Sequence, residues 1–203
     1  MRRTVVVAIA LGVSTSAAHA GGFYMGLSLG ASGAGHDRAF DSRFDSRGHA
    51  AMGVTIGGES HGFTLDLTFL GAGYSLRADP ETDAALMWFG GDLGRRVWLD
   101  DRLALGASLG LHAALLVPWA ADDILPPELE GGGGESWTAS ARLEYFLCRQ
   151  PPLNPDYHGP IKSLDASIVL EVRRERMFLE FDDFEAEPAV TLVTVGLRGG
   201  LGW

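Results

Sequence analysis

After residue 20 the chain alternates apolar residues with small or polar residues, one by one, in segment after segment. The last segment is the clearest. Its apolar set comprises Thr191, Val193, Val195, Leu197, Gly199, Leu201 and Trp203. Between these lie Leu192, Thr194, Gly196, Arg198, Gly200 and Gly202. A helix repeats every 3.6 residues and does not place two such sets on opposite faces, whereas a β-strand does. The period of two therefore predicts an all-β chain.

Eight segments show this alternation. They are residues 23–32, 52–57, 63–69, 87–94, 103–112, 137–145, 164–173 and 191–203. Most approach the length of about 9–11 residues that a tilted strand needs to cross a membrane. An even number of strands is what a closed bacterial membrane barrel requires.

The connections between the segments also alternate. Residues 58–62 and 99–102 are tight turns. The longer, polar or charged connections are residues 33–49, 76–83, 115–135 and 174–189. Long outer loops and short inner turns are typical of outer-membrane barrels. The proline-rich connection 147–161 breaks this rule, so either it is an insertion or the sixth and seventh segments are misplaced.

Side-chain size decides which face meets lipid. A soluble barrel encloses its apolar face, whereas an outer-membrane barrel turns that face outward. Here the apolar face is bulky and, apart from Arg95, nearly free of charge, while the other face is rich in Gly and Ser. That second face also carries Asp66, Asp92, Arg96, Arg142, Glu144, Asp165, Glu171, Arg173 and Arg198. We therefore expect an eight-stranded antiparallel up-and-down transmembrane β-barrel, whose interior charges pair across neighbouring strands in place of a hydrophobic core.

The first twenty residues have the features of an export signal. Arg2 and Arg3 precede an apolar stretch at 4–13, and Ala18 and Ala20 put small residues where a signal peptidase cleaves. The apolar stretch is too short to cross a bilayer. We expect residues 1–20 to be removed and residues 21–203 to form the barrel domain.

These features resemble the small bacterial outer-membrane barrels, a group that includes the OmpA transmembrane domain, OmpX and the opacity-like proteins. The resemblance implies an outer-membrane location and contact with membrane lipid and lipopolysaccharide. In that group, the barrel-assembly machinery recognises a closing strand that ends in an aromatic residue. By resemblance, the corresponding assembly signal here is Val195, Leu197, Leu201 and Trp203.

Charge and cysteine usage exclude other classes. The net charge of −10 argues against nucleic acid, whose phosphates require clustered Lys and Arg. The single Cys148 excludes a disulfide scaffold, and we assign it no role. The acidic outer loops could hold a divalent cation that bridges lipopolysaccharide phosphates, or could be solvated loops. The repeat Phe40-Asp41-Ser42-Arg43, Phe44-Asp45-Ser46-Arg47 is expected to be exposed in the first loop, as a local duplication or a contact patch.

A search for catalytic residues finds one weak set. Ser108 and His112 lie on one face and Glu144 on the next strand, as a Ser/His/acid group would require. However, four residues of a strand span about 13 Å, so Ser108 and His112 cannot bond directly. The histidines show no metal-ligand spacing. We expect no catalytic residue, cofactor or metal.

Three functions follow in order of support. The first is a non-enzymatic outer-membrane barrel that supports envelope integrity or surface interaction through its extracellular loops. The second is a narrow channel or carrier for small solutes through a Gly-lined interior. Any such channel would be narrow, because eight strands leave room for little more than side chains. The third and weakest is a lipid A-modifying enzyme.

Overall fold

The fold is taken from a computed structural model. It describes residues 21–35, 37–45, 49–79, 82–118, 125–150 and 163–202. The expected export signal, the connection 151–162 and Trp203 lie outside the described residues. None of the helices in the described ranges is long and apolar enough to cross a membrane.

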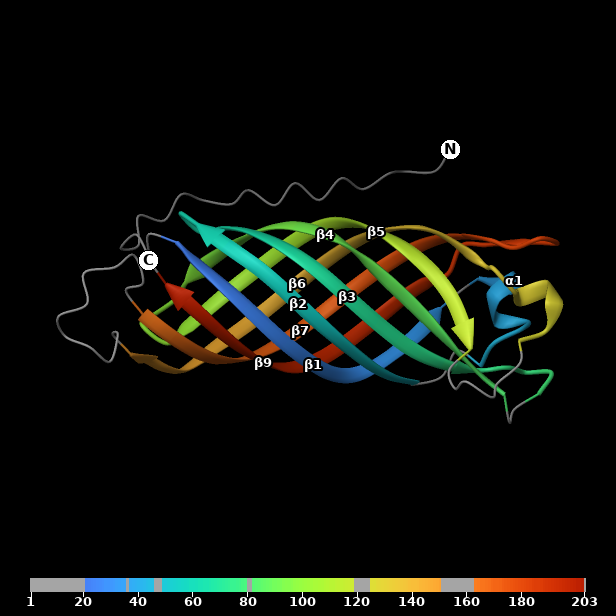
Figure 1. Cartoon of the computed structure of the whole chain (residues 1–203), viewed down its shortest axis with the longest axis horizontal. Coiled ribbons are helices and arrows are strands. Elements are labelled where there is room, and N and C mark those ends of the chain that lie inside the picture. The colour runs from blue at the N-terminus through green and yellow to red at the C-terminus, as the bar shows by residue number, and fades with distance from the viewer. Residues whose placement is uncertain are drawn as a thin grey trace.

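In the described part of the chain, eight long strands form a closed antiparallel barrel (Figure 1). They are β1 (Gly22–Gly35), β2 (His49–Ser60), β3 (Phe63–Ser75), β4 (Asp83–Trp98), β5 (Leu103–Pro118), β6 (Gly133–Gln150), β7 (Ser163–Glu180) and β9 (Ala189–Gly202). Each long strand pairs with the next long strand along the chain, and β1 closes the barrel against β9, from Gly22↔Gly202 to Gly35↔Ala189. The predicted fold class and the positions of the eight strands are confirmed.

Two ends of the barrel are distinguished below. The terminal end holds the first residues of β1 and the last residues of β9, and the loop end holds the short helix α1 (Arg38–Asp41) (Figure 1). The third loop contributes the 3-10 turn η1 (Pro127–Leu129), and the fourth contributes the short strand β8 (Glu185–Ala186).

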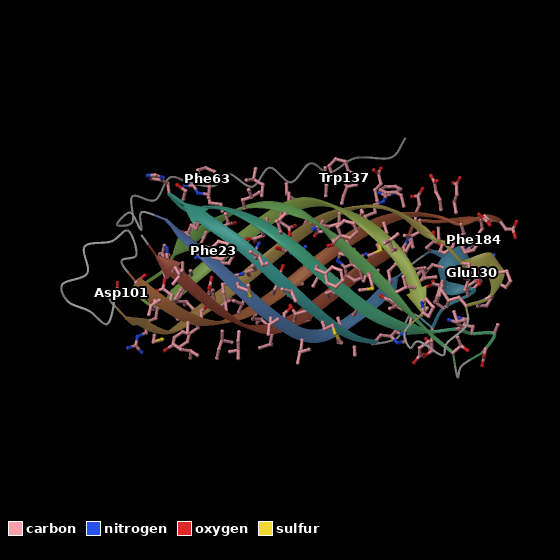
Figure 2. All side chains as sticks on the ribbon, in the orientation of Figure 1. Phe23, Phe63, Asp101, Glu130, Trp137 and Phe184 are labelled. Atoms are coloured by element: carbon pink, nitrogen blue, oxygen red, sulfur yellow. The ribbon has the colours of Figure 1, made fainter. Side chains whose placement is uncertain are left out.

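The barrel is apolar outside and charged inside. Leu27, Leu67 and Leu109, on three different strands, are 64%, 65% and 68% exposed, whereas Asp66 and Asp92 are 0% exposed. Apolar side chains project all along the outer wall (Figure 2). Alternation produces this arrangement because successive side chains of a strand point to opposite faces. Arg95, the one charge expected on the outer face, lies at the terminal end with its guanidinium 5.3 Å from the centre of the Phe63 ring.

The strands are longer than the alternation predicted. The stretch 174–189, expected to be a loop, is mostly strand: β7 runs to Glu180, and β8 folds back on it through the pair Leu179↔Ala186. The charges of this stretch indicated a loop, but Arg174 and Arg176 are exposed on the outer side of a strand.

The long sixth connection does not reflect misplaced strands. β6 reaches Gln150 and β7 begins at Ser163, and the two pair along their whole length apart from a bulge between Phe146 and Cys148. The predicted positions of the sixth and seventh segments are therefore confirmed, and a long connection joins them.

Candidate functional site: the filled lumen and its cap

The middle of the lumen is crossed by an arginine of β6. Arg142 Nη1 lies 2.5 Å from Asp66 Oδ2 of β3, and its Nε lies 4.0 Å from Glu171 of β7. The Tyr24 hydroxyl of β1 donates a second hydrogen bond to Asp66. Arg142 and Asp66 are both buried, so four strands that lie around the barrel wall are joined through its centre.

Near the terminal end, one carboxylate receives two arginines. Glu144 lies 2.8 Å from Arg96 and 3.1 Å from Arg198, and it accepts a 2.6 Å hydrogen bond from the Ser167 hydroxyl. Arg96 also pairs with Glu59 of β2, a residue that was assigned to a turn and so was missed from the predicted set.

Toward the loop end, Arg173 of β7 binds Asp92 of β4 at 2.9 Å and Glu171 at 3.0 Å. Thr68 donates a further hydrogen bond of 2.9 Å to Asp92. The ninth predicted residue, Asp165, lies on the inward face of β7 in register with Gly200. The predicted arginines thus form ion pairs with predicted acids.

One ion pair, Arg142–Glu171 at 4.0 Å, joins register partners on neighbouring strands as expected, whereas the shorter arginine pairs between strands skip at least one strand. Asp66 and Asp92 are register partners on adjacent strands, and neither has an arginine as a register partner. Each is neutralised instead by an arginine that reaches across the lumen. An arginine side chain can span the lumen because the interior of an eight-stranded barrel is so narrow that side chains fill it.

Inward glycines accommodate these side chains and do not leave a channel. A Cβ added at Gly57 would overlap Asp66, and one added at Gly110 would overlap Asp92. A cavity of about 10 Å³ remains beside Gly106 and Arg142, which is about the space of one water molecule. This packing gives no support to the alternative of a channel through a Gly-lined interior.

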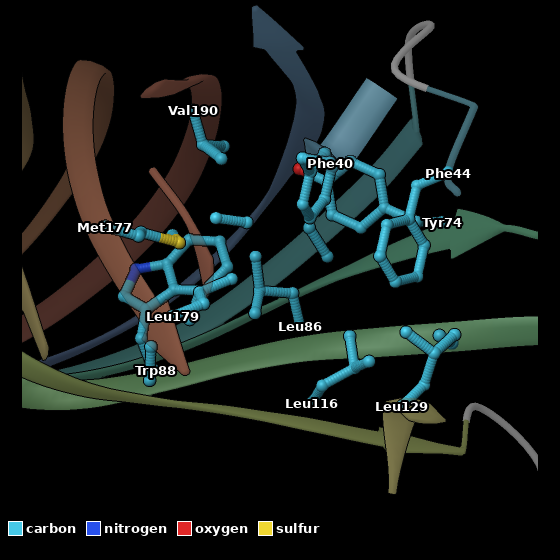
Figure 3. Close-up of a cluster of buried hydrophobic side chains, with 14 of the residues drawn as sticks. Phe40, Phe44, Tyr74, Leu86, Trp88, Leu116, Leu129, Met177, Leu179 and Val190 are labelled. Atoms are coloured by element: carbon cyan, nitrogen blue, oxygen red, sulfur yellow. The ribbon is translucent and has the colours of Figure 1, made fainter. Parts of the chain in front are cut away.

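The loop end of the lumen is filled by apolar side chains, which we call the cap cluster (Figure 3). Its members are Phe40, Phe44, Ala51, Leu70, Ala72, Tyr74, Leu76, Ala84, Leu86, Trp88, Ala114, Leu116, Leu125, Leu129, Met177, Leu179, Ala186, Val190 and Leu192. The expectation of a charged interior in place of a hydrophobic core thus holds only for part of the barrel. At the loop end the inward positions are themselves apolar.

The repeated Phe-Asp-Ser-Arg sequence supplies two residues of the cap cluster. Phe40 and Phe44 are 0% exposed, which contradicts their expected exposure in the first loop. The repeat of four residues matches the turn of α1, where the Phe44 amide donates to the Phe40 carbonyl, so both rings lie on one side. Their centres are 4.5 Å apart, and Tyr74 packs edge-on against Phe40 at 5.5 Å.

Polar contacts pin the first loop to the fourth. Asp37 caps α1 by accepting a 2.8 Å hydrogen bond from the Phe40 amide, and its other oxygen accepts a 3.0 Å bond from the Glu187 amide. The Arg43 guanidinium lies 3.6 Å from the centre of the Phe184 ring, which stacks on Phe181 at 4.2 Å. The cap is therefore held by contacts between loops that are distant in sequence.

The weak catalytic set is not assembled. Ser108 bonds Ser140 at 2.8 Å and accepts from Arg142, while Glu144 lies with the arginines of the terminal end. His112 contacts Asp92 and Glu175 instead. Among the described residues, no group of three or more His, Cys, Asp or Glu is arranged to hold a metal ion.

Glu175 is the second interior acid that the sequence analysis missed, because it fell in the stretch expected to be a loop. The available signal was the continued alternation after Arg173, in which Glu175 and Met177 both stay on the inward face. The acids Glu180, Asp182, Asp183, Glu185 and Glu187 are exposed around the tip of the β7–β8 hairpin.

A closed antiparallel barrel of eight strands, apolar outside and charged inside, defines an outer-membrane β-barrel. The fold is similar to that of Neisserial surface protein A (NspA), with a TM-score of 0.56 and 13% sequence identity over 87% of this chain and 95% of that protein. The resemblance to small eight-stranded outer-membrane barrels is thereby confirmed at the level of the fold.

Two structures of Ail, the attachment invasion locus protein of Yersinia pestis, show a more distant likeness. One, in complex with the heparin analogue sucrose octasulfate, has a TM-score of 0.45 at 13% identity and covers 88% of this chain and 99% of its own. The other, in a phospholipid bilayer nanodisc, has a TM-score of 0.39 at 13% identity, with coverages of 86% and 98%. No protein-family model and no curated protein matches the sequence.

Proposed function

We propose that the protein is a closed, non-enzymatic anchor in the outer membrane that supports envelope integrity or surface interaction through its loop end. The observation that carries this proposal is the filled lumen. Arginine–carboxylate pairs occupy its middle and terminal end, and the cap cluster occupies its loop end.

The pinned cap supports a role in presentation and argues against transport. A solute path would have to displace fully buried rings such as Phe40 and Trp88 and break the Asp37 and Arg43 contacts. A loop end held this firmly offers partners a fixed surface, and a preorganised surface loses little entropy on binding.

The outer wall supports contact with outer-membrane lipid and lipopolysaccharide. Trp137 and Tyr145 lie eight positions apart on the outer face of β6. At about 3.4 Å per residue and a tilt near 40°, they are separated along the barrel axis by roughly 20 Å. Aromatic residues at both edges of such a band belong at the membrane interfaces, and exposed Arg176 and Arg174 lie on β7 at the loop-end edge of the band, in register with Trp137 and Ala139.

The closing strand supports recognition by the barrel-assembly machinery. Val195 and Leu197 are exposed on the outer face of β9, and Leu201 lies on the same face at the terminal end. We propose that these residues, with Trp203, form the assembly signal. Substituting the three described residues with serine should slow membrane assembly in cells more than it slows refolding of the purified chain in detergent.

Planar-bilayer recording tests the closed lumen. The purified chain, shown to be folded by heat-modifiable migration on a gel, should give no stable conductance steps near neutral pH. Reproducible open steps from the folded material would refute the anchor proposal and favour a channel.

Mass analysis of lipid A tests the absence of catalysis. Cells that express the protein should contain lipid A of unchanged mass. A mass shift that disappears with Ser108→Ala would instead show that the protein is an enzyme. The substitution leaves the arginine pairs of Glu144 in place, so the loss of the mass shift would not be due to their removal.

A further inference from the structure

Four side chains form a ring directly beneath the cap cluster. His112 of β5 lies between two acids, with Nδ1 3.2 Å from Glu175 Oε1 and Nε2 3.6 Å from Asp92 Oδ1. Arg173 closes the ring from the other side, 2.9 Å from Asp92 and 3.4 Å from Glu175. The ring residues are almost fully buried, and an added Cβ at Gly90, the register partner of His112, would overlap the imidazole.

The geometry of the ring favours two protons on His112. Each imidazole nitrogen faces an oxygen of a carboxylate, which only accepts hydrogen bonds when ionised. A neutral imidazole has one accepting nitrogen, which would then face another acceptor. A doubly protonated His112 instead gives a ring in which negative and positive groups alternate.

The charges around the ring offer no other cation to the acids. Glu171 of β7 also binds Arg173, at 3.0 Å. Asp66 of β3 is the register partner of Asp92 but is paired with Arg142. The remaining polar groups that bond the ring are uncharged: Thr68, Ser136 and Thr138. With a neutral His112, Arg173 alone would face Asp92 and Glu175, and it would share Glu171 with Arg142, whose Nε lies 4.0 Å from that carboxylate.

The ring lies where the charged part of the lumen meets the apolar part. Met177 follows Glu175 by two residues on the same face of β7, and Trp88 precedes Asp92 by four on the same face of β4. Both are 0% exposed members of the cap cluster. The ring therefore ties together β4, β5 and β7, three of the strands that carry the cap.

We propose that this ring is a proton-dependent latch, in which the second proton of His112 holds the strands beneath the cap and its loss at alkaline pH loosens the closed lumen. The inference rests on the closed lumen proposed above. Because loss of that proton leaves an accepting nitrogen facing a carboxylate, stability should fall as the pH rises.

Nitrogen-15 NMR of the protein in detergent micelles tests the protonation state directly. At pH 8, His112 should show two protonated ring nitrogens. His112→Gln assigns the signals by removing them. A neutral, single-tautomer His112 at pH 7 would overturn the proposal.

The melting temperature, taken as the temperature at which the folded band is lost on a gel, tests the latch. Between pH 6 and pH 10 it should fall by roughly 6–20 °C in the wild type, the range that losing a buried charge partner produces in a chain of this size. The double variant His112→Gln/Glu175→Gln, which removes one acid with the base, should show a much smaller fall. The Asp66→Asn variant should retain the wild-type fall, because Asp66 is the register partner of Asp92 but lies outside the ring.

These outcomes separate the two proposals. A wild-type melting temperature that does not change with pH, or a double variant that keeps the full fall, overturns the latch and leaves the closed barrel intact. Conductance steps at pH 6 overturn the closed barrel while the NMR signals of His112 still report the ring. Steps that are absent at pH 6, present at pH 10 and suppressed in the double variant support the latch.

Discussion

Replacing Arg142 with methionine should destabilise the barrel strongly. The change removes the 2.5 Å pair with Asp66 and the bond to Ser108, and it leaves Asp66 buried with the Tyr24 hydroxyl as its donor. Breaking a buried ion pair by removing one partner costs about 3–5 kcal/mol. At about 2–4 °C per kcal/mol for a chain of this size, we expect the melting temperature to fall by roughly 6–20 °C.

Urea unfolding in detergent micelles measures this effect, with tryptophan fluorescence and gel migration as two independent signals. Arg176→Met is the matched control, because it removes the 3.1 Å pair with Glu187, whose partners are 63% and 55% exposed. Exposed pairs contribute about 0–1 kcal/mol. The double variant Arg142→Met/Asp66→Asn should recover at least half of the loss, because it no longer leaves a buried charge unpaired.

An Arg142→Met variant as stable as Arg176→Met would contradict this reasoning. It would mean that water reaches the middle of the lumen and solvates Asp66. Additive losses in the double variant would lead to the same conclusion, because groups that do not interact show additive effects.

Five further substitutions probe the cap, the outer wall and the glycine packing. Phe40→Ala should lower the free energy of unfolding by about 3–5 kcal/mol and expose the first loop to proteolysis, because the ring is fully buried. Leu27→Arg, in the middle of the apolar band, should cost about 2–4 kcal/mol when folding is measured in lipid vesicles, and Phe23→Arg at the terminal end about 0–1 kcal/mol. Gly90→Ala should cost about 1–3 kcal/mol in urea unfolding through overlap with His112, whereas Gly199→Ala, which has nothing within 4 Å, should be neutral; equal effects would contradict the packing argument.

Alternation was sufficient to predict the strands and their faces. In β9, Val195 and Leu197 are exposed and Arg198 is buried, as the period of two requires. The ends of the strands were harder to predict, because near the loop end both faces of a strand carry apolar or small side chains. Ala84, Ala85 and Leu86 follow one another on β4 and are all buried, so no alternation marks this stretch as strand.

The partners inside the lumen could not be predicted from the sequence. Alternation shows that a side chain points inward, but not which residue it meets across the barrel. Arg142 and Asp66 are separated by 76 positions and by the two strands β4 and β5, and the pairing follows from barrel diameter and strand stagger. Phe40 was missed for a different reason, since one turn of helix is too short to show a period.

Arg198 also bears on how the barrel can close correctly. A slip of β9 by two residues against β1 would keep every apolar side chain facing lipid, so the outer wall cannot detect the error. Such a slip would put Gly196 or Gly200 where Arg198 now meets Glu144. A single cation among inward glycines thus acts as a register check on the final seam, and penalises misaligned closure that hydrophobicity alone would tolerate.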